Sequence, residues 1–122
     1  MKHLNRAIGS DGEDIAREYL LKEGYEILEV NFRSKFGEID IIGKDKSYIT
    51  FIEVKTRYNL SFGIPSESVN FRKQLKIIKT AQIFILRNQL SEFDIRFDIV
   101  EVYLNTTDNS KEVKILKNAF QT

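Results

Sequence analysis

The sequence of 122 residues contains no cysteine and a single histidine, His3. The lack of cysteine excludes a disulfide framework and any thiolate metal site, and one histidine leaves almost no material for zinc binding or Ser-His-Asp catalysis. No apolar run approaches the roughly 20 residues that cross a bilayer, and the charged start lacks the apolar stretch of a signal peptide. We therefore expect a cytoplasmic protein with no membrane partner, whose chemistry would depend on carboxylates, lysines and a hard metal ion.

Internal repeats, low-complexity tracts and Pro/Gly-rich linkers are also lacking. Hydrophobic residues make up 42% and charged residues 30% of the chain, as in ordinary globular proteins. A chain of this length has room for one core. We therefore expect residues 1–122 to form a single domain.

The net charge of +1 argues against a strong nucleic-acid binder, but the charges are unevenly distributed. Residues 55–87 carry one acidic side chain, Glu67, and seven basic ones: Lys55, Arg57, Arg72, Lys73, Lys76, Lys79 and Arg87. This local basic patch is compatible with a nucleic-acid surface and equally with a solvated helix face.

Two helices are predicted. The first covers about residues 10–23, where Ser10 and Glu13 have the spacing of a capping box and Gly24 ends the helix. The second covers about 66–88, after a loop at 58–65 and with Ser66 or Ser68 as its cap. Its expected apolar stripe consists of Phe71, Leu75, Ile78, Gln82 and Ile85.

Segments 25–32, 37–42, 48–55 and 95–104 are rich in β-branched and aromatic residues and predict strands, with a possible fifth at 113–116. The second and third form a hairpin around residues 44–47. The fold class is therefore α/β, in the order αβββαβ(β), with a sheet flanked by helices.

The hairpin contains a notable group of charged residues. Glu53 and Lys55 are two apart and share a strand face. A loop at 44–47 places Asp40 opposite Phe51 and diagonal to Glu53. Any shift of the pairing by an even number keeps Asp40, Glu53 and Lys55 on one face.

Two carboxylates converging within an apolar hairpin repel each other, and a divalent cation relieves that repulsion. Hard oxygen ligands favour Mg²⁺ or Mn²⁺, while Lys55 would orient water or stabilise charge on a phosphate. The alternative is a solvated face with cross-strand ion pairs. The apolar Ile49 and Phe51 on the same face as Glu53 argue against it.

The spacing of Asp40 and Glu53-Val54-Lys55 resembles the D…ExK core of restriction-endonuclease-like, PD-(D/E)xK nucleases. The wider sequence resembles the largely uncharacterised YraN-like family, similar in fold to archaeal Holliday junction resolvases. The matching segments include Gly12-Glu13, Asn31-Phe32-Arg33, Gly37 to Ile42, Phe51 to Arg57, Arg72-Lys73-Gln74, Arg96 to Val100 and Asn118-Ala119-Phe120.

The resemblance implies that Asp40 and Glu53 are metal ligands and that Lys55 assists the attacking water. It implies Glu13 as a further ligand, which competes with its role in a capping box, and the Val54 backbone carbonyl as another. Ile39 replaces the proline of the motif, which contributes no ligand.

Other candidates surround this group. Glu38 and Gln74 are expected to support the site, and Asp98 to pair with Arg96 or Arg33. The expected contacts to a nucleic-acid backbone are Arg33, Arg57, Arg72, Lys73, Lys76 and Lys79.

The sequence thus predicts a metal-dependent nuclease acting on DNA or on structured, branched nucleic acid. The alternative is a catalytically silent nucleic-acid-binding or protein-interaction module on the same fold. Activity that requires a homodimer or a partner enzyme is a third hypothesis.

Overall fold

The computed structural model describes residues 2–58 and 69–122, with side chains from residue 12 onward in the first helix. Its elements are α1 (Lys2–Lys22), β1 (Glu26–Arg33), β2 (Glu38–Asp45), β3 (Tyr48–Tyr58), α2 (Phe71–Arg87), β4 (Asp94–Leu104) and β5 (Lys111–Phe120). The predicted α/β class and element order are confirmed, including the fifth strand.

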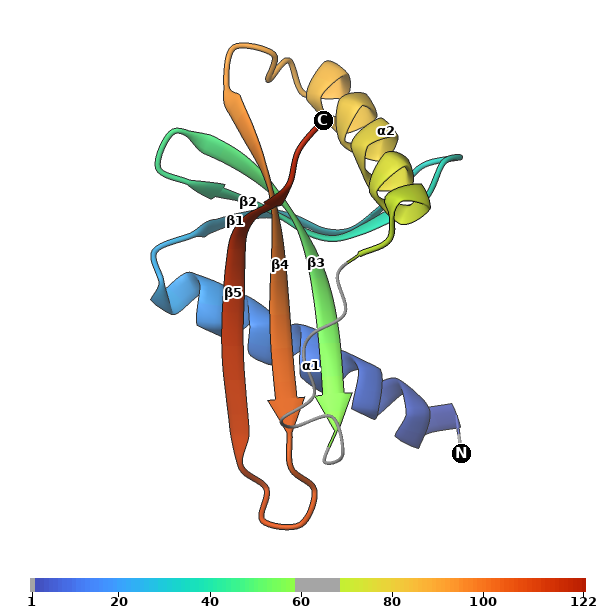
Figure 1. The fold of residues 1–122 in the computed structure, drawn as a ribbon, viewed down its shortest axis with the longest axis vertical. Helices are drawn as coiled ribbons and strands as arrows, with labels where there is room; N and C mark the ends of the chain where they lie inside the picture. Colours follow the sequence, from blue (N-terminus) through green and yellow to red (C-terminus); the bar gives the residue numbers. More distant parts are fainter. Residues whose placement is uncertain (1, 59–68) are drawn as a thin grey trace.

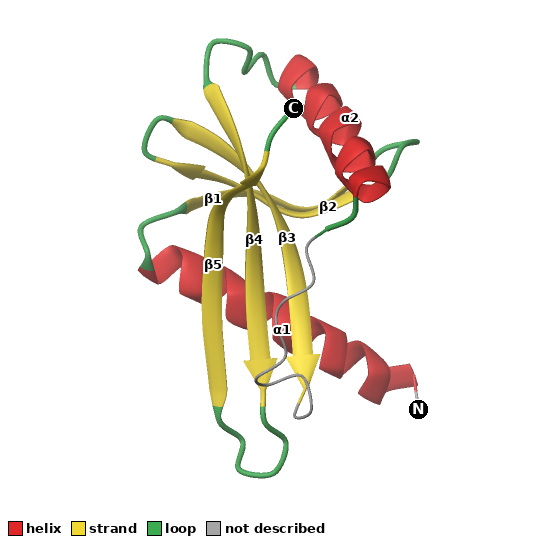
Figure 2. Cartoon of the chain, in the orientation of Figure 1, coloured by secondary structure: helices red, strands yellow, loops and turns green. Residues whose placement is uncertain are grey.

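The five strands form one mixed sheet in the order β1-β2-β3-β4-β5. All neighbours are antiparallel except β3 and β4, which are parallel because α2 lies between them in the chain. Figures 1 and 2 show β3, β4 and β5 side by side, while β1 and β2 cross at a steep angle toward α2. The sheet is therefore strongly twisted, and its two halves separate at one end of the β2–β3 pair.

Each face of the sheet carries its own core. Ala16 and Leu20 of α1 pack on Ile52, Val100 and Val102. On the other face, α2 covers an aromatic cluster in which the Phe84 ring lies 5.1 Å from Phe32 and 6.1 Å from Phe51, edge to face. A helix on each face buries the sheet from both sides.

The first helix starts at Lys2, not near Ser10, so the predicted capping box is wrong. A residue of a capping type does not begin a helix when the residues before it are themselves helical. The expected end is confirmed. Gly24 has φ +93°, and the Tyr25 amide donates to the Leu20 carbonyl in a Schellman turn.

The second helix starts at Phe71, and its cap is Asn70, whose side chain accepts a hydrogen bond from the Lys73 amide. The predicted caps Ser66 and Ser68 and most of the predicted 58–65 loop lie outside the described residues. The predicted apolar stripe is confirmed only in part. Ile78 and Ile85 pack against the core, but Phe71 is 72% exposed, Leu75 and Gln82 are also exposed, and the buried positions are Ile77, Thr80, Ala81 and Phe84.

The physical reason is that α2 offers apolar residues on more than one side, and the sheet selects the side containing small Ala81 and Thr80, which allow close approach. The hairpin also differs from expectation: its loop is only Lys46 and Ser47, with Lys46 at φ +58°. None of the described helices is long and apolar enough to cross a membrane.

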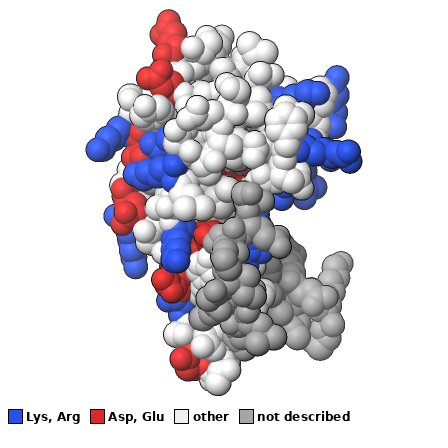
Figure 3. Space-filling model, in the orientation of Figure 1, with Lys and Arg blue, Asp and Glu red and all other residues white. Residues whose placement is uncertain are grey.

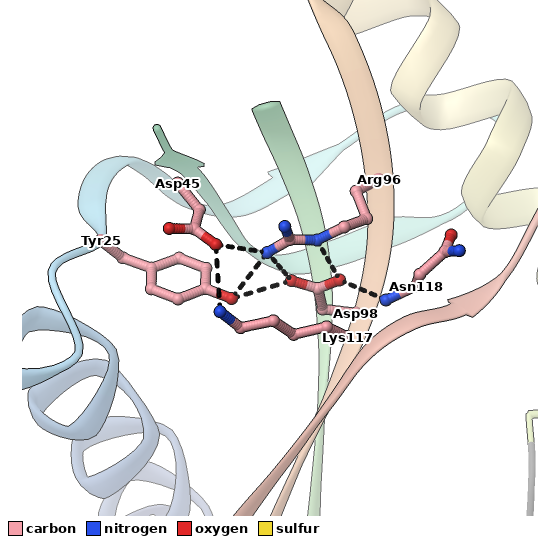
Figure 4. Close-up of polar contacts among 6 residues, drawn as sticks. All are labelled: Tyr25, Asp45, Arg96, Asp98, Lys117 and Asn118. Atoms are coloured by element: carbon pink, nitrogen blue, oxygen red, sulfur yellow. Dashed lines mark hydrogen bonds and ion pairs between the residues drawn. The ribbon is translucent and has the colours of Figure 1, made fainter. Parts of the chain in front are cut away.

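One end of the sheet is held by a buried polar network (Figure 4). Arg96 donates to both Asp98 oxygens at 2.9 Å and to Asp45 at 2.8 Å. Tyr25 and the Asn118 amide also donate to Asp98, and Lys117 donates to Asp45. The expected pairing of Asp98 with Arg96 is confirmed; Arg33 instead pairs with Glu38.

Candidate functional site

Asp40 lies where β2 leaves β3. The pairing of these strands begins at Ile41 with Ile52, two positions shifted from the predicted register. Continuing this register would place Asp40 directly opposite Glu53. Because the shift is even, the two carboxylates still share a face.

The geometry around Asp40 is irregular in a way that the sequence did not indicate. Ile39 joins the core under α2, whereas Ile41 joins the core under α1, although residues two apart ordinarily share a face. In the β1–β2 ladder, Asp40 faces Asn31, which has φ +53°. The strand therefore twists sharply at Asp40, and the backbone pairing to β3 ends there.

Beyond this point the Asp40 side chain, in place of a backbone carbonyl of β2, accepts the hydrogen bond from the Val54 amide of β3. Its Oδ2 accepts a hydrogen bond from the Val54 amide at 2.8 Å, which holds the carboxylate beside Glu53. Burial and the Glu53 charge raise the pKa of Asp40 to about 7, although the Val54 hydrogen bond opposes the rise. Glu13 and Glu38 raise it further. Asp40 therefore lies close enough to Glu53, Glu13 and Glu38 for their negative charges to repel its own, at one partly buried place.

Glu53 reaches toward α2. Its Oε1 lies 2.7 Å from Lys73 Nζ, and its side chain is only 10% exposed. Lys73, predicted as a phosphate contact, is thus brought to the candidate site. The Lys73 ammonium neutralises the Glu53 carboxylate at the place where a bound metal ion would do so.

Glu13 enters from α1 on the other side. Partial burial and the charges of Glu38 and Asp14 raise its pKa, with Arg17 opposing. Glu13 lines a small cavity of about 120 Å³ together with Asn31 and Ile41. Since α1 begins at Lys2, the capping role is removed, and Glu13 is a candidate site residue.

Gly12 explains how α1 comes so close. A Cβ at this position would overlap the Thr56 hydroxyl of β3, so only glycine permits this approach. The glycine before Glu13 therefore sets the distance from α1 to the strand that carries Glu53 and Lys55.

Lys55 pairs in register with Glu101 of β4, and both share a face with Glu53. Glu101 is 1% exposed, and its Oε2 has no hydrogen-bond partner among the described residues. Sequence reasoning missed Glu101. The available signal was a carboxylate interrupting the apolar alternation of Phe97, Ile99 and Tyr103.

The remaining predicted residues have varied positions. Gln74 donates to the Val69 carbonyl at 2.7 Å and so fixes the start of α2. Arg33 and Glu38 form an ion pair at 3.3 Å. Arg57 is half-buried, and Arg72, Lys76 and Lys79 are exposed. The structure brings Lys73 and Glu38 to the site but keeps Gln74 in a local structural contact.

The donor set fits a hard divalent cation. Two or three carboxylates with water would suit Mg²⁺ or Mn²⁺, which commonly take only one or two protein carboxylates. Within the described part of the chain, no three Asp, Glu, His or Cys side chains already form a closed metal-binding cluster. The Lys73 contact and the Val54 hydrogen bond currently occupy the two central carboxylates.

The five-stranded mixed sheet with a helix on each face is the fold of a restriction-endonuclease-like domain. Residues 12–102 match the model of the uncharacterised protein family UPF0102, the YraN-like family, and the chain belongs to it. It is 56% identical over 122 residues to UPF0102 proteins of Clostridium botulinum strains 657 and Loch Maree, and 54% identical over 121 residues to one of Clostridium kluyveri. Each comparison covers 99% of both chains. The family resemblance seen in the sequence is confirmed.

Proposed function

We propose that this protein is a metal-dependent nuclease that hydrolyses phosphodiester bonds in DNA or structured nucleic acid. The observation that carries the proposal is Asp40: a partly buried carboxylate, held beside Glu53 at the point where two strands part, with its pKa raised to about 7. Such mutual repulsion is a cost to folding that structural ion pairs avoid, and it is typical of functional sites.

Asp40 and Glu53 would hold the ion, with Glu13 or the Val54 carbonyl as further ligands. A divalent cation at this place would act as a Lewis acid and lower the pKa of a bound water. The Val54 amide fixes the orientation of Asp40, so that one carboxylate oxygen keeps a constant direction.

Lys55 would stabilise negative charge on the phosphate or orient the attacking water, from the same face as Glu53. Lys73 would leave Glu53 when a cation replaces its charge, and its exposed ammonium would then contact phosphate. Glu101, beside Lys55, would position the lysine through the shared face of β3 and β4.

The test is incubation of linear, flapped and four-way-junction DNA and structured RNA with Mg²⁺ or Mn²⁺. Asp40→Asn should abolish cleavage, and Lys55→Ala should reduce it by about 100-fold or more. The matched controls are Asp94→Asn and Lys46→Ala, which change exposed residues at the other end of the hairpin and β4. Cleavage that survives unchanged in both site variants would refute the proposal.

Metal binding is tested separately by thermal unfolding. Mg²⁺ or Mn²⁺ should raise the Tm of the wild type by mass action, and Asp40→Asn should remove that rise. Binding of nucleic acid without cleavage under every condition would instead support the silent-module alternative.

A further inference from the structure

The β1–β2 turn presents an exposed aromatic ring among basic side chains. Phe36 is 37% exposed, and the ammonium groups of Lys35 and Lys79 lie 5.2 Å and 5.3 Å from its ring centroid. A flat ring with two cations beside it suits a ligand that has both flat rings and negative charge.

The turn is fixed to α2, so the ring has a defined place. Ser34 Oγ and Thr80 Oγ1 are 2.8 Å apart, and the Phe36 amide donates to Ser34 Oγ. Gly37 lies against Lys76, where an added Cβ would be 3.4 Å from the Lys76 Cβ. A rigid aromatic loses little conformational freedom when a ring stacks on it.

One helix connects this turn to the candidate site. Lys73 contacts Glu53, and Lys79 contacts Phe36. These lysines are six residues apart, or about 9 Å along the axis of α2. Lys76 lies between them in the chain, and α2 contains no acidic residue. In Figure 3, basic side chains gather at the right-hand edge, where Figure 1 places α2 and the β1–β2 turn.

We infer that Phe36, Lys35, Lys76 and Lys79 form a binding site for single-stranded nucleic acid, with an unpaired base stacked on Phe36. The inference rests on the proposed function and adds its substrate class: a strand unpaired near the cleaved bond. Bases in a duplex are stacked inside the helix and cannot meet Phe36, whereas an unpaired base can. The lysines would contact the flanking phosphates.

A base that stacks on a ring face covered by Lys35 or Lys79 would displace that ammonium from the ring. An exposed cation–π contact is weaker than a base–aromatic stack, and the displaced lysine regains an ionic partner on the phosphate. The lysines would bind the phosphates and Phe36 would bind the base. A polyanion without bases lacks the ring to stack, and a duplex keeps its bases inside the helix.

The experiment uses Phe36→Trp as a reporter, since the chain has no tryptophan. With EDTA present to prevent cleavage, a single-stranded DNA or RNA oligonucleotide should quench the tryptophan emission. A duplex or an abasic strand of equal charge should not. The matched control is Phe93→Trp, another exposed phenylalanine with a lysine, Lys44, 5.4 Å from its ring centroid; its emission should not respond.

Affinity measurements on variants separate stacking from packing. Phe36→Ala and Phe36→Leu should each weaken single-strand binding by about tenfold and leave binding of the abasic strand unchanged. Wild-type affinity in Phe36→Leu would mean that apolar bulk suffices, and would overturn the inference. Equal quenching by duplex, or by the Phe93→Trp control, would also overturn it.

The two proposals fail in different ways. Loss of cleavage in Asp40→Asn together with no response of Phe36→Trp to single strands would refute this inference and leave the nuclease intact. Quenching without cleavage by any metal would keep the single-strand site and refute the nuclease.

Discussion

Two groups of carboxylates, one around Asp45 at the turn of the β2–β3 hairpin and one around Asp40 at its open end, have different surroundings in the fold. At the closed end, Asp45 and Asp98 are held by Arg96, Lys117 and Tyr25 (Figure 4). Burial acts to raise the pKa of Asp45, but hydrogen bonds from Arg96 and Lys117 outweigh it and lower that pKa. At the open end, burial and Glu53 raise the pKa of Asp40. Similar residues thus serve as structural anchors at one end and as a repelling pair at the other.

The contrast teaches how to distinguish the two roles. An anchoring carboxylate is accompanied by a cation, as Arg96 of β4 accompanies Asp98 on its own strand and Asp45 on β2. Asp40 has no cation of its own among the described contacts; it has an amide donor and several acidic neighbours. The first arrangement pairs its buried charges within the chain, whereas the second leaves Asp40 among acidic neighbours.

The largest expected effect comes from breaking the anchored end. Arg96→Met would leave Asp45 and Asp98 buried with much of their pairing removed, and should lower the free energy of unfolding by about 3–5 kcal/mol. Denaturant unfolding measures this. The control, Arg33→Met, removes a more exposed ion pair and should cost well under about 1 kcal/mol. Equal losses in both variants would contradict the structural role of the network.

Asp40→Asn should raise the free energy of unfolding instead of lowering it. The raised pKa means that the folded protein holds the proton of Asp40 more tightly than the unfolded chain. The stability from this group is therefore complete below pH about 4 and is lost as pH rises through about 7. In EDTA at pH 8, Asp40→Asn should stabilise the protein by on the order of 2 kcal/mol.

The measurement is unfolding free energy from pH 5 to pH 9, in which the wild type should lose stability more steeply than the variant. Asp98→Asn is the matched control from the anchored end, and it should destabilise at pH 8. A destabilised Asp40→Asn would show that Asp40 is an anchor after all.

Gly12→Ala tests the approach of α1 to the open end. The new methyl group would meet the Thr56 side chain, and overpacking of this kind costs about 1–3 kcal/mol, partly offset by the better helix propensity of alanine. Thermal unfolding should show a net loss of about 1 kcal/mol. The double variant Gly12→Ala/Thr56→Ala should recover it; no recovery would mean that another contact sets the approach.

The smallest effects concern the charges around Asp40. Glu53→Gln should lower the pKa of Asp40 more than Glu13→Gln does, because Glu53 is the larger charge contribution. NMR titration of the Asp40 carboxyl in metal-free protein measures the order. A reversed order would place Glu13, not Glu53, nearest to Asp40.

Much of the architecture follows from local sequence. Alternating and β-branched segments predicted all five strands, and Gly24 predicted the end of α1. The pairing of Asp98 with Arg96 was also visible, because the two are two apart on one strand. These features depend on side-chain periodicity and on backbone conformations that neighbouring residues dictate.

The predictions that failed concern which of several similar residues caps a helix or becomes buried. Both Ser10 and Asn70 belong to residue types that cap helices, but only Asn70 does so here. The buried stripe of α2 was partly misplaced because Phe71 and Leu75 are as apolar as the residues that the sheet covers. Such choices are made by packing against partners that are distant in the chain.

The sequence by itself predicted that Asp40, Glu53 and Lys55 gather at one place on the hairpin, because strand alternation survives an even shift in register. Only the tertiary structure decided what surrounds them: Glu13 brought in beside Gly12, Lys73 from α2, and Glu101 from the parallel strand β4. The reason is physical. Alternation is a property of a few adjacent residues, whereas the twist at Asp40 and the approach of both helices result from packing the whole sheet.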